Sequence, residues 1–213
     1  MEWFMNLIFS THEYQGWGWN IVSISFLVTA GFTFFLQLPG LVNQARTIWR
    51  NKSAEGVEML TFTAFLTYFA VFFVYAVSIQ SGAGVLNVLV LLVPQVFILA
   101  GIAWCKPLRT IDKLAALAAT LLFVLAVLLP RKEVFYTIAS IAVLIGLLLQ
   151  PIEMMRTKVS KNIALSFPLN FLIVAAVWTI YALAIGDVFL AGASGAFTLV
   201  YLWAVILWFR YRQ

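Results

Sequence analysis

The sequence predicts an all-α integral membrane protein. Seven transmembrane helices are expected, arranged as two parallel three-helix repeats joined by a linker helix. Composition, the lengths of the apolar segments and an internal repeat predict this class. Of the 213 residues, 64% are hydrophobic and only 10% are charged, whereas about 25% are charged in an average soluble domain. Because too few polar side chains remain to cover a water-exposed surface, we expect the chain to lie in a lipid bilayer.

The apolar segments have the length of transmembrane helices. Each is about 20 residues long, enough for a helix to cross the roughly 30 Å hydrocarbon core. They are continuous rather than alternating, so a transmembrane barrel is not expected. The predicted spans are Ile21–Gln44, Leu60–Ile79, Gly84–Trp104, Leu114–Leu129, Phe135–Met155, Leu165–Ile185 and Val188–Phe209.

The basic residues indicate the orientation. Of the 13 Lys and Arg residues, only Arg131 and Lys132 follow the fourth span, and the others follow the first, third, fifth and seventh. Because cytoplasmic loops are enriched in Lys and Arg, we expect the N-terminus outside and the C-terminus in the cytoplasm. The predicted parts are an external segment (1–20), a first repeat (21–104), a linker helix with its loops (105–134), a second repeat (135–209) and a cytoplasmic tail (210–213).

Several classes of function are not expected. Cys105 is the only cysteine and His12 the only histidine, so one chain cannot assemble a disulfide framework or a Cys/His metal site. There is no Gly-rich phosphate loop, catalytic triad or pair of embedded carboxylates, so neither an enzyme nor a cofactor is expected. Basic loops account for the net charge of +5, and no basic domain for nucleic acid is present.

An internal repeat becomes visible when the chain is shifted by 106 residues. Polar and basic coincidences at this one offset carry the signal, because apolar identities arise from composition alone. Since three is an odd number of crossings, two units of the same orientation need one more helix between them, and the span Leu114–Leu129 supplies it. The aligned pairs are Gln44 with Gln150, Arg50 with Arg156, Lys52 with Lys158, Phe65 with Phe171, Tyr75 with Tyr181, and Phe72 with Trp178.

Two sets of motifs resemble a known family. Gln44 stands eight residues before a Lys-Ser-Ala-Glu-Gly segment that begins at Lys52, and Gln150 stands eight before Lys158. The second half contains Trp178-x-x-Tyr181, Asp187-x-Phe189 and Ser194-Gly195. These residues resemble the full-length, seven-helix form of the SWEET and PQ-loop (MtN3/saliva) transporter superfamily.

The sequence also departs from that family. Asn43 and Leu149 occupy the positions of the prolines that the family has before each glutamine. We therefore expect the helices to flex at Pro39 and Pro151 instead. The literal Pro94-Gln95 is not followed by Lys-Ser, and we interpret it as a helix kink with Gln95 as a pocket-lining amide.

The resemblance implies a solute-binding site between the two repeats, where family members present one asparagine from each half. Asn87 matches in kind, and Ser194 is a shorter hydroxyl one residue out of register. Trp178 can stack on the apolar face of a sugar and donate its N–H group, and Phe72 is its repeat counterpart. The alternative for Asn87 is a hydrogen bond to a neighbouring helix only.

Further residues are expected near the two ends of the path. Gln44 and Gln150 are predicted to line an inner gate, and Tyr75 and Tyr181 to lie at the outer side, where interfacial anchoring is an equally good account. Gly192 and Gly195, with neighbouring alanines, are expected to allow close helix packing.

The implied function is a carrier of a small polar solute, with a sugar as the first candidate, working by alternating access of the two bundles. Proton coupling needs an embedded carboxylate or histidine, and only Glu153 is expected to be embedded, near Arg156, so passive uniport is favoured. An amino-acid carrier of PQ-loop type, including proton-coupled forms, is the second candidate. A non-transporting receptor or accessory protein is the third.

The expected partners are the solute and the lipid bilayer, and a homo-oligomer is left open. We expect the plasma membrane rather than an organelle as the location.

Overall fold

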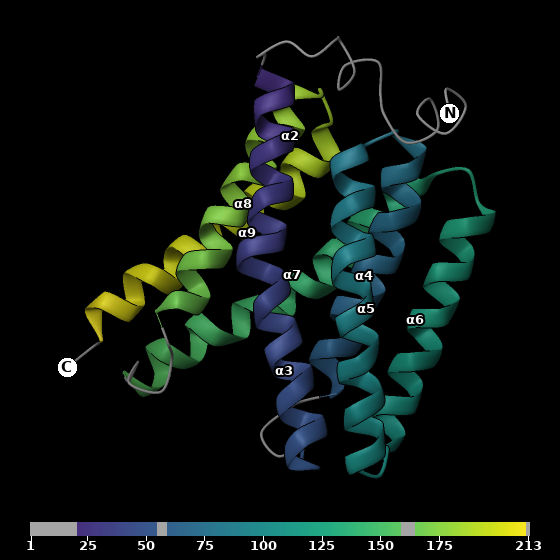
Figure 1. Ribbon diagram of the computed structural model, residues 1–213, viewed down its shortest axis with the longest axis vertical. Helices are drawn as coiled ribbons and strands as arrows, with labels where there is room; N and C mark the ends of the chain where they lie inside the picture. Colours follow the sequence, from purple (N-terminus) through teal and green to yellow (C-terminus); the bar gives the residue numbers. More distant parts are fainter. Residues whose placement is uncertain (1–20, 55–58, 159–164, 212–213) are drawn as a thin grey trace.

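The computed structural model describes residues 21–54, 59–158 and 165–211, and these form helices with no strand among them (Figure 1). The first span is one long helix made of α2 (Ile21–Phe32), a π-helical turn η1 (Thr33–Gln37) and α3 (Leu38–Asn51). The others are α4 (Met59–Ser78), α5 (Gly82–Cys105), α6 (Thr110–Leu128), α7 (Lys132–Thr157), α8 (Ser166–Ala184) and α9 (Val188–Arg210).

The described helices agree with the predicted spans, and the all-α membrane class is confirmed. Within the described residues, the first span, α4, α5, α6 and α9 are long and apolar enough to cross a membrane, and Pro168–Ala184 of α8 is a shorter apolar helix. The predicted external segment 1–20 lies outside the described residues.

Backbone conformation repeats at the offset of 106 residues. Lys52 (φ 48°) ends α3 and Lys158 (φ 54°) ends α7, both in the left-handed region. Gln80 (φ 53°) and Gly186 (φ 76°) lie in the tight turns before α5 and α9. Because left-handed backbone is uncommon, its recurrence at one offset supports the repeat independently of side-chain identity.

The helix caps repeat in the same way. The side chain of Ser81 accepts a hydrogen bond from the Gly84 N–H (3.0 Å) and caps α5. The side chain of Asp187 accepts one from the Leu190 N–H (2.8 Å) and caps α9. Caps of this kind satisfy backbone N–H groups that would otherwise lack a partner, so both third helices begin in the same way.

In each repeat the third helix lies between the other two. In the first repeat α5 packs against α3 and α4, and in the second α9 packs against α7 and α8. The linker α6 packs against α4 and α7. Between the repeats α2 contacts α8 and α4 contacts α7. In both contacts the first helix of one repeat meets the second helix of the other, as expected when two similar units are related by a pseudo-twofold axis.

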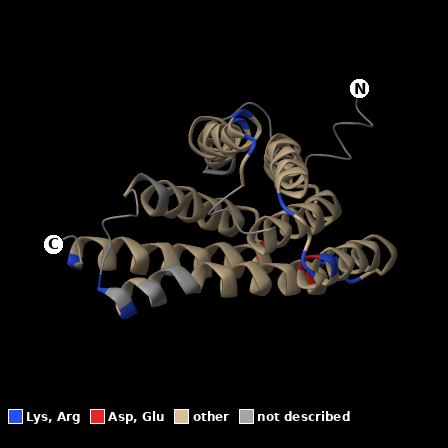
Figure 2. Ribbon diagram, turned by 90° about the horizontal axis from the view of Figure 1, so that it is seen from below, with Lys and Arg blue, Asp and Glu red and all other residues tan. Residues whose placement is uncertain are grey.

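The molecule has two different ends. The basic end carries Lys52, Lys106 and Lys158, whereas the Asp187 end carries the two tight turns (Figures 1 and 2). The lower parts of α7 and α9 lean away from α3 and α5 in Figure 1. Seen from below, the helices of the first repeat appear nearly end-on, and those of the second lie obliquely (Figure 2). The two repeats therefore diverge toward the basic end.

Close helix packing uses glycines other than the expected ones. A Cβ atom on Gly84 would lie 2.8 Å from Ala76 Cβ, and one on Gly101 would lie 2.8 Å from Ile48 Cγ2. A Cβ on Gly192 would meet nothing within 4 Å, and one on Gly195 would be in ordinary contact at 3.9 Å. The expectation for Gly192 and Gly195 is therefore wrong, because neither faces the close approach of a neighbouring helix.

Candidate functional site

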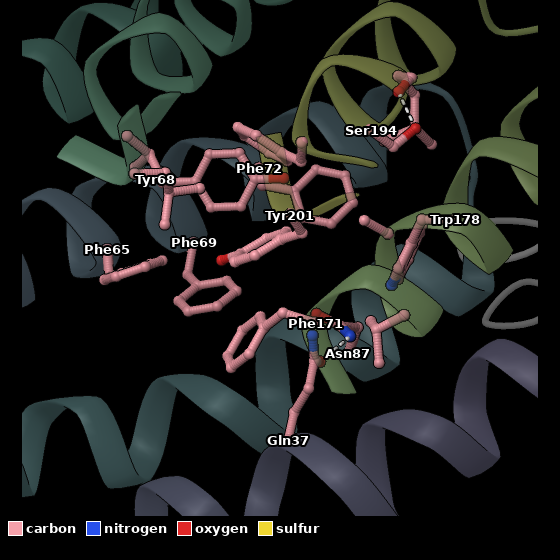
Figure 3. A pocket seen from close by; sticks show the side chains of 16 residues that line it. Gln37, Phe65, Tyr68, Phe69, Phe72, Asn87, Phe171, Trp178, Ser194 and Tyr201 are labelled. Atoms are coloured by element: carbon pink, nitrogen blue, oxygen red, sulfur yellow. Dashed lines mark hydrogen bonds between the residues drawn. The ribbon is translucent and has the colours of Figure 1, made fainter. Parts of the chain in front are cut away.

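A pocket lies between the two repeats and is lined by side chains of η1, α4, α5, α7, α8 and α9 (Figure 3). It contains all four residues predicted to bind solute: Phe72, Asn87, Trp178 and Ser194. Their role in binding stays a prediction, but the structure brings them to one place. Eight of its 16 lining residues are aromatic, and none of the 16 is charged: Gln37, Phe65, Tyr68, Phe69, Phe72, Asn87, Val143, Leu147, Phe171, Val174, Ala175, Trp178, Leu190, Ser194, Phe197 and Tyr201.

The repeat counterparts Phe72 and Trp178 meet in this pocket. Their rings are edge-to-face, with centroids 5.5 Å apart and an interplanar angle of 76°. Phe72 is 2% and Trp178 is 7% exposed. Because edge-to-face pairs are a favoured aromatic geometry, this contact holds the two repeats together at the wall of the pocket.

Asn87 is buried and takes part in a hydrogen-bond cluster of the first repeat. Its Nδ2 group donates to Thr33 Oγ1 (2.6 Å) and to Gln37 Oε1 (3.3 Å), both in η1. The alternative drawn from the sequence, a bond to a neighbouring helix, is therefore correct for the amide nitrogen. Asn87 also lines the pocket, and its role in solute binding stays a prediction.

Ser194 contributes less polarity than its position suggests. Its hydroxyl donates to the Leu190 carbonyl (2.6 Å) within α9, and the side chain is 4% exposed. The hydroxyl proton is therefore used inside the helix, and only the oxygen lone pairs remain for a solute.

Two reciprocal hydrogen bonds close the Asp187 end. The Tyr75 hydroxyl donates to the Asp187 carboxylate at 2.8 and 2.7 Å. The Tyr181 hydroxyl and Ser81 Oγ are 2.7 Å apart. Since Tyr75 and Tyr181, and likewise Ser81 and Asp187, are repeat counterparts, the tyrosine of each repeat bonds the helix cap of the other. The expectation that both tyrosines lie at one end of the path agrees with this geometry.

Tyr136 of α7 fills the space between the pocket and these bonds. It is fully buried, and its ring stacks on Tyr75 with centroids 4.6 Å apart. Its hydroxyl lies 3.5 Å from that of Tyr68. The sequence gives no signal for Tyr136 because its repeat counterpart is Ala30. Asp187 is predicted from the sequence only as part of a motif, and its capping role could have been predicted because its counterpart Ser81 is also a residue type that caps helices.

Of the predicted gate and amide residues that the structure describes, Gln44 and Gln95 are not among those that line the pocket. Gln44 is half-buried in α3, and the side chain of Gln150 lies outside the described residues. Gln95 is 2% exposed in α5, and its Oε1 has no hydrogen-bond partner among the described residues. The inner gate at Gln44 and Gln150 therefore stays a prediction.

The two predicted flex points differ in their surroundings. Pro39 is exposed and follows the π turn, as the second residue of α3. Pro151 is buried within α7, which continues as an α-helix to Thr157. A local departure from α-helical geometry therefore accompanies Pro39 only.

Comparison with known proteins identifies the fold. No family model matches the sequence, and no curated relative does. The structure is similar to that of a eukaryotic SWEET transporter, with a TM-score of 0.73 and 14% sequence identity over 95% of this chain and 99% of that one. At this identity the similarity establishes the fold. The resemblance predicted from the motifs is thus confirmed at the level of the fold, and the solved protein is a transporter rather than an enzyme.

Proposed function

We propose that this protein is a membrane carrier for a small, uncharged polar solute, with a sugar as the first candidate. The observation that supports this most is the uncharged pocket between the two repeats, which is lined by the Trp178 indole and by the amide side chains of Gln37 and Asn87. An indole suits the apolar face of a sugar ring, and amides can bond its hydroxyl groups.

The proposed mechanism is alternating access by rocking of the two repeats. The described conformation is closed at the Asp187 end, where Tyr75, Tyr136 and Tyr181 are each at most 3% exposed. Pocket residues nearer the basic end, such as Phe65 and Phe171, are partly exposed. If the basic end is cytoplasmic, this is an inward-facing state, and separating Tyr75 from Asp187 opens the other side.

Passive transport is favoured because no acid or histidine is among the described residues that line the pocket. An embedded group that gains and loses a proton is the usual requirement for proton coupling. None of the residues that line the pocket is Asp, Glu or His. A zwitterionic amino acid is also less well matched, since its two charges would find no countercharge there.

The test is uptake of labelled sugars and amino acids into proteoliposomes, with and without a pH gradient. We expect saturable uptake of at least one sugar that equilibrates without accumulating and is insensitive to the gradient. Accumulation driven by the gradient would contradict passive transport, and uptake of amino acids alone would replace the sugar. If no member of the panel is transported, the carrier proposal fails in favour of a receptor or accessory protein.

A further inference from the structure

We infer that Gln37 is a further solute-binding residue, and that Gln37 and Asn87 together present one fixed donor and one fixed acceptor to two adjacent hydroxyl groups of the solute. This inference rests on the proposed sugar-carrier function and deepens it. The sequence alone does not single out Gln37, whose repeat counterpart is the apolar Val143.

The orientation of the Asn87 amide follows from a chain of hydrogen bonds. The Thr33 hydroxyl donates its proton to the Thr29 carbonyl (3.0 Å). Thr33 Oγ1 can therefore only accept from Asn87, 2.6 Å away, and the atom that faces it must be the NH₂ group. This settles the assignment of nitrogen and oxygen, which for an amide depends on the surrounding network.

The Gln37 amide is oriented by the same chain. The second hydrogen of Asn87 Nδ2 goes to Gln37 Oε1 (3.3 Å), so the Gln37 NH₂ group points elsewhere. Both side chains line the pocket and lie next to each other there (Figure 3). Asn87 Oδ1 and Gln37 Nε2 have no hydrogen bond to another described residue. Asn87 Oδ1 and Gln37 Nε2 therefore present an acceptor and a donor side by side. The orientation of each amide is fixed by the hydrogen bonds that its other polar atom makes.

The π turn accounts for the presence of Gln37 at this place. In η1 the Leu38 N–H bonds the Thr33 carbonyl, five residues back, and the following Pro39 has no N–H group to offer. A π turn inserts one extra residue into a helix and is often found at functional sites. The second repeat has no such turn, because α7 is an uninterrupted α-helix from Lys132 to Thr157.

Two adjacent hydroxyl groups match this pair of atoms. One hydroxyl donates to Asn87 Oδ1, and its neighbour accepts from Gln37 Nε2. The second repeat places no amide in the pocket: Val143 stands at the repeat position of Gln37, and the Ser194 proton is used within α9. Its other polar groups there, the Trp178 N–H and the Tyr201 hydroxyl, are single groups and do not form a fixed donor–acceptor pair. We therefore place the polar edge of the solute against the first repeat and its apolar face against Trp178.

The test measures KM for a transported sugar and for its monodeoxy analogues in proteoliposomes. Wild-type protein should show KM raised on the order of tenfold for analogues lacking either of two adjacent hydroxyl groups, because each loss leaves a buried polar atom unpaired. Gln37→Met should raise KM for the parent sugar by a similar factor. It should not raise KM further for the analogue that already lacks the hydroxyl bound by Gln37.

Two control variants separate binding from folding. Asn43→Met makes the same kind of change at an exposed position of α3 and should leave KM unchanged. Thr33→Val removes the group that orients Asn87 and should weaken discrimination among the analogues, whereas Thr33→Ser keeps the hydroxyl and should restore it.

Three results would overturn the inference. The first is a Gln37→Met protein with the wild-type KM for every sugar, which would leave the carrier function standing. The second is an equal rise in KM for all analogues, which would indicate a structural role. The third is wild-type protein that transports no sugar, in which case the proposed function fails as well.

Discussion

Tyr75 links the two repeats twice, because its ring stacks on Tyr136 and its hydroxyl donates to Asp187. Its partner, Asp187, also caps α9, so one carboxylate serves both the helix end and the contact between repeats. Hydrogen bonds to charged groups are stronger than neutral ones. The counterpart bond between Tyr181 and Ser81 joins two hydroxyls and should contribute less to closure of the Asp187 end.

We predict that Tyr75→Phe favours opening at the Asp187 end. Loss of a hydrogen bond to a charged group costs about 1.5–3 kcal/mol, which corresponds to a shift of at least tenfold toward the open state. The measurement is the rate at which an impermeant maleimide, added on the Asp187 side, labels Leu190→Cys in a Cys105→Ser background. Leu190 lines the pocket and is 2% exposed.

Tyr181→Phe is the matched control for this prediction. It removes a neutral bond, so the labelling rate should rise only a few-fold. Equal labelling rates in the parent protein and the Tyr75→Phe variant would show that this hydroxyl does not hold the end closed.

At the scale of single residues, motif and repeat comparison named four of the sixteen residues that line the pocket. Asn87, Trp178 and Ser194 were found because they match family motifs, and Phe72 because it aligns with Trp178. Gln37 and Tyr136 could not be found in this way, since each faces an apolar residue, Val143 or Ala30, in the repeat alignment. Their positions depend on helix rotation rather than on residue type.

At the scale of elements, α5 is approached closely by both of its neighbours in the first repeat, at two glycines. Gly84 allows the approach of α4, and Gly101 allows that of α3, where Trp49 Nε1 also donates to the Phe97 carbonyl (2.9 Å). Small residues at helix contacts are a common means of association in membranes, where burial of apolar surface gives little driving force. These close contacts are consistent with α3, α4 and α5 moving together as one unit during transport.

We predict that Gly84→Ala and Gly101→Ala each destabilise the protein by about 1–3 kcal/mol, because overpacking forces neighbouring atoms to shift. The measurement is the thermal unfolding midpoint in detergent, which should fall for both variants. Gly192→Ala is the control, since its Cβ meets nothing within 4 Å, and its midpoint should not fall. A midpoint unchanged in Gly84→Ala and Gly101→Ala would show that these helices adjust freely.

At the scale of the whole molecule, the pseudo-twofold relation joins several independent observations. The left-handed residues, the helix caps, the exchanged tyrosine bonds and the contacts of α2 with α8 and α4 with α7 all follow it. The amide groups of the pocket do not follow it, since Gln37 of η1 and Asn87 of α5 both belong to the first repeat. A symmetric scaffold therefore carries an asymmetric site.

We predict that the Asp187 end faces the outside of the cell and the basic end the cytoplasm. In a Cys105→Ser background, Ser78→Cys should react with an impermeant maleimide added to intact cells, and Lys113→Cys should react only after the membrane is opened. Both positions are exposed and lie at opposite ends. The reverse pattern would invert the proposed orientation, and absence of both signals at the cell surface would place the protein in an organelle.

The sequence by itself determined the membrane class, the helical spans, the 106-residue repeat and the family resemblance. These follow from hydropathy, length and local motifs, which do not depend on how the helices are packed. Only the tertiary structure decided which tyrosine bonds which helix cap, which glycines allow close packing, and that Gln37 stands beside Asn87. These features depend on the rotation and separation of helices that are far apart in the chain. The π turn at Thr33–Gln37 changes the rotation of the first span, and no sequence motif predicts it.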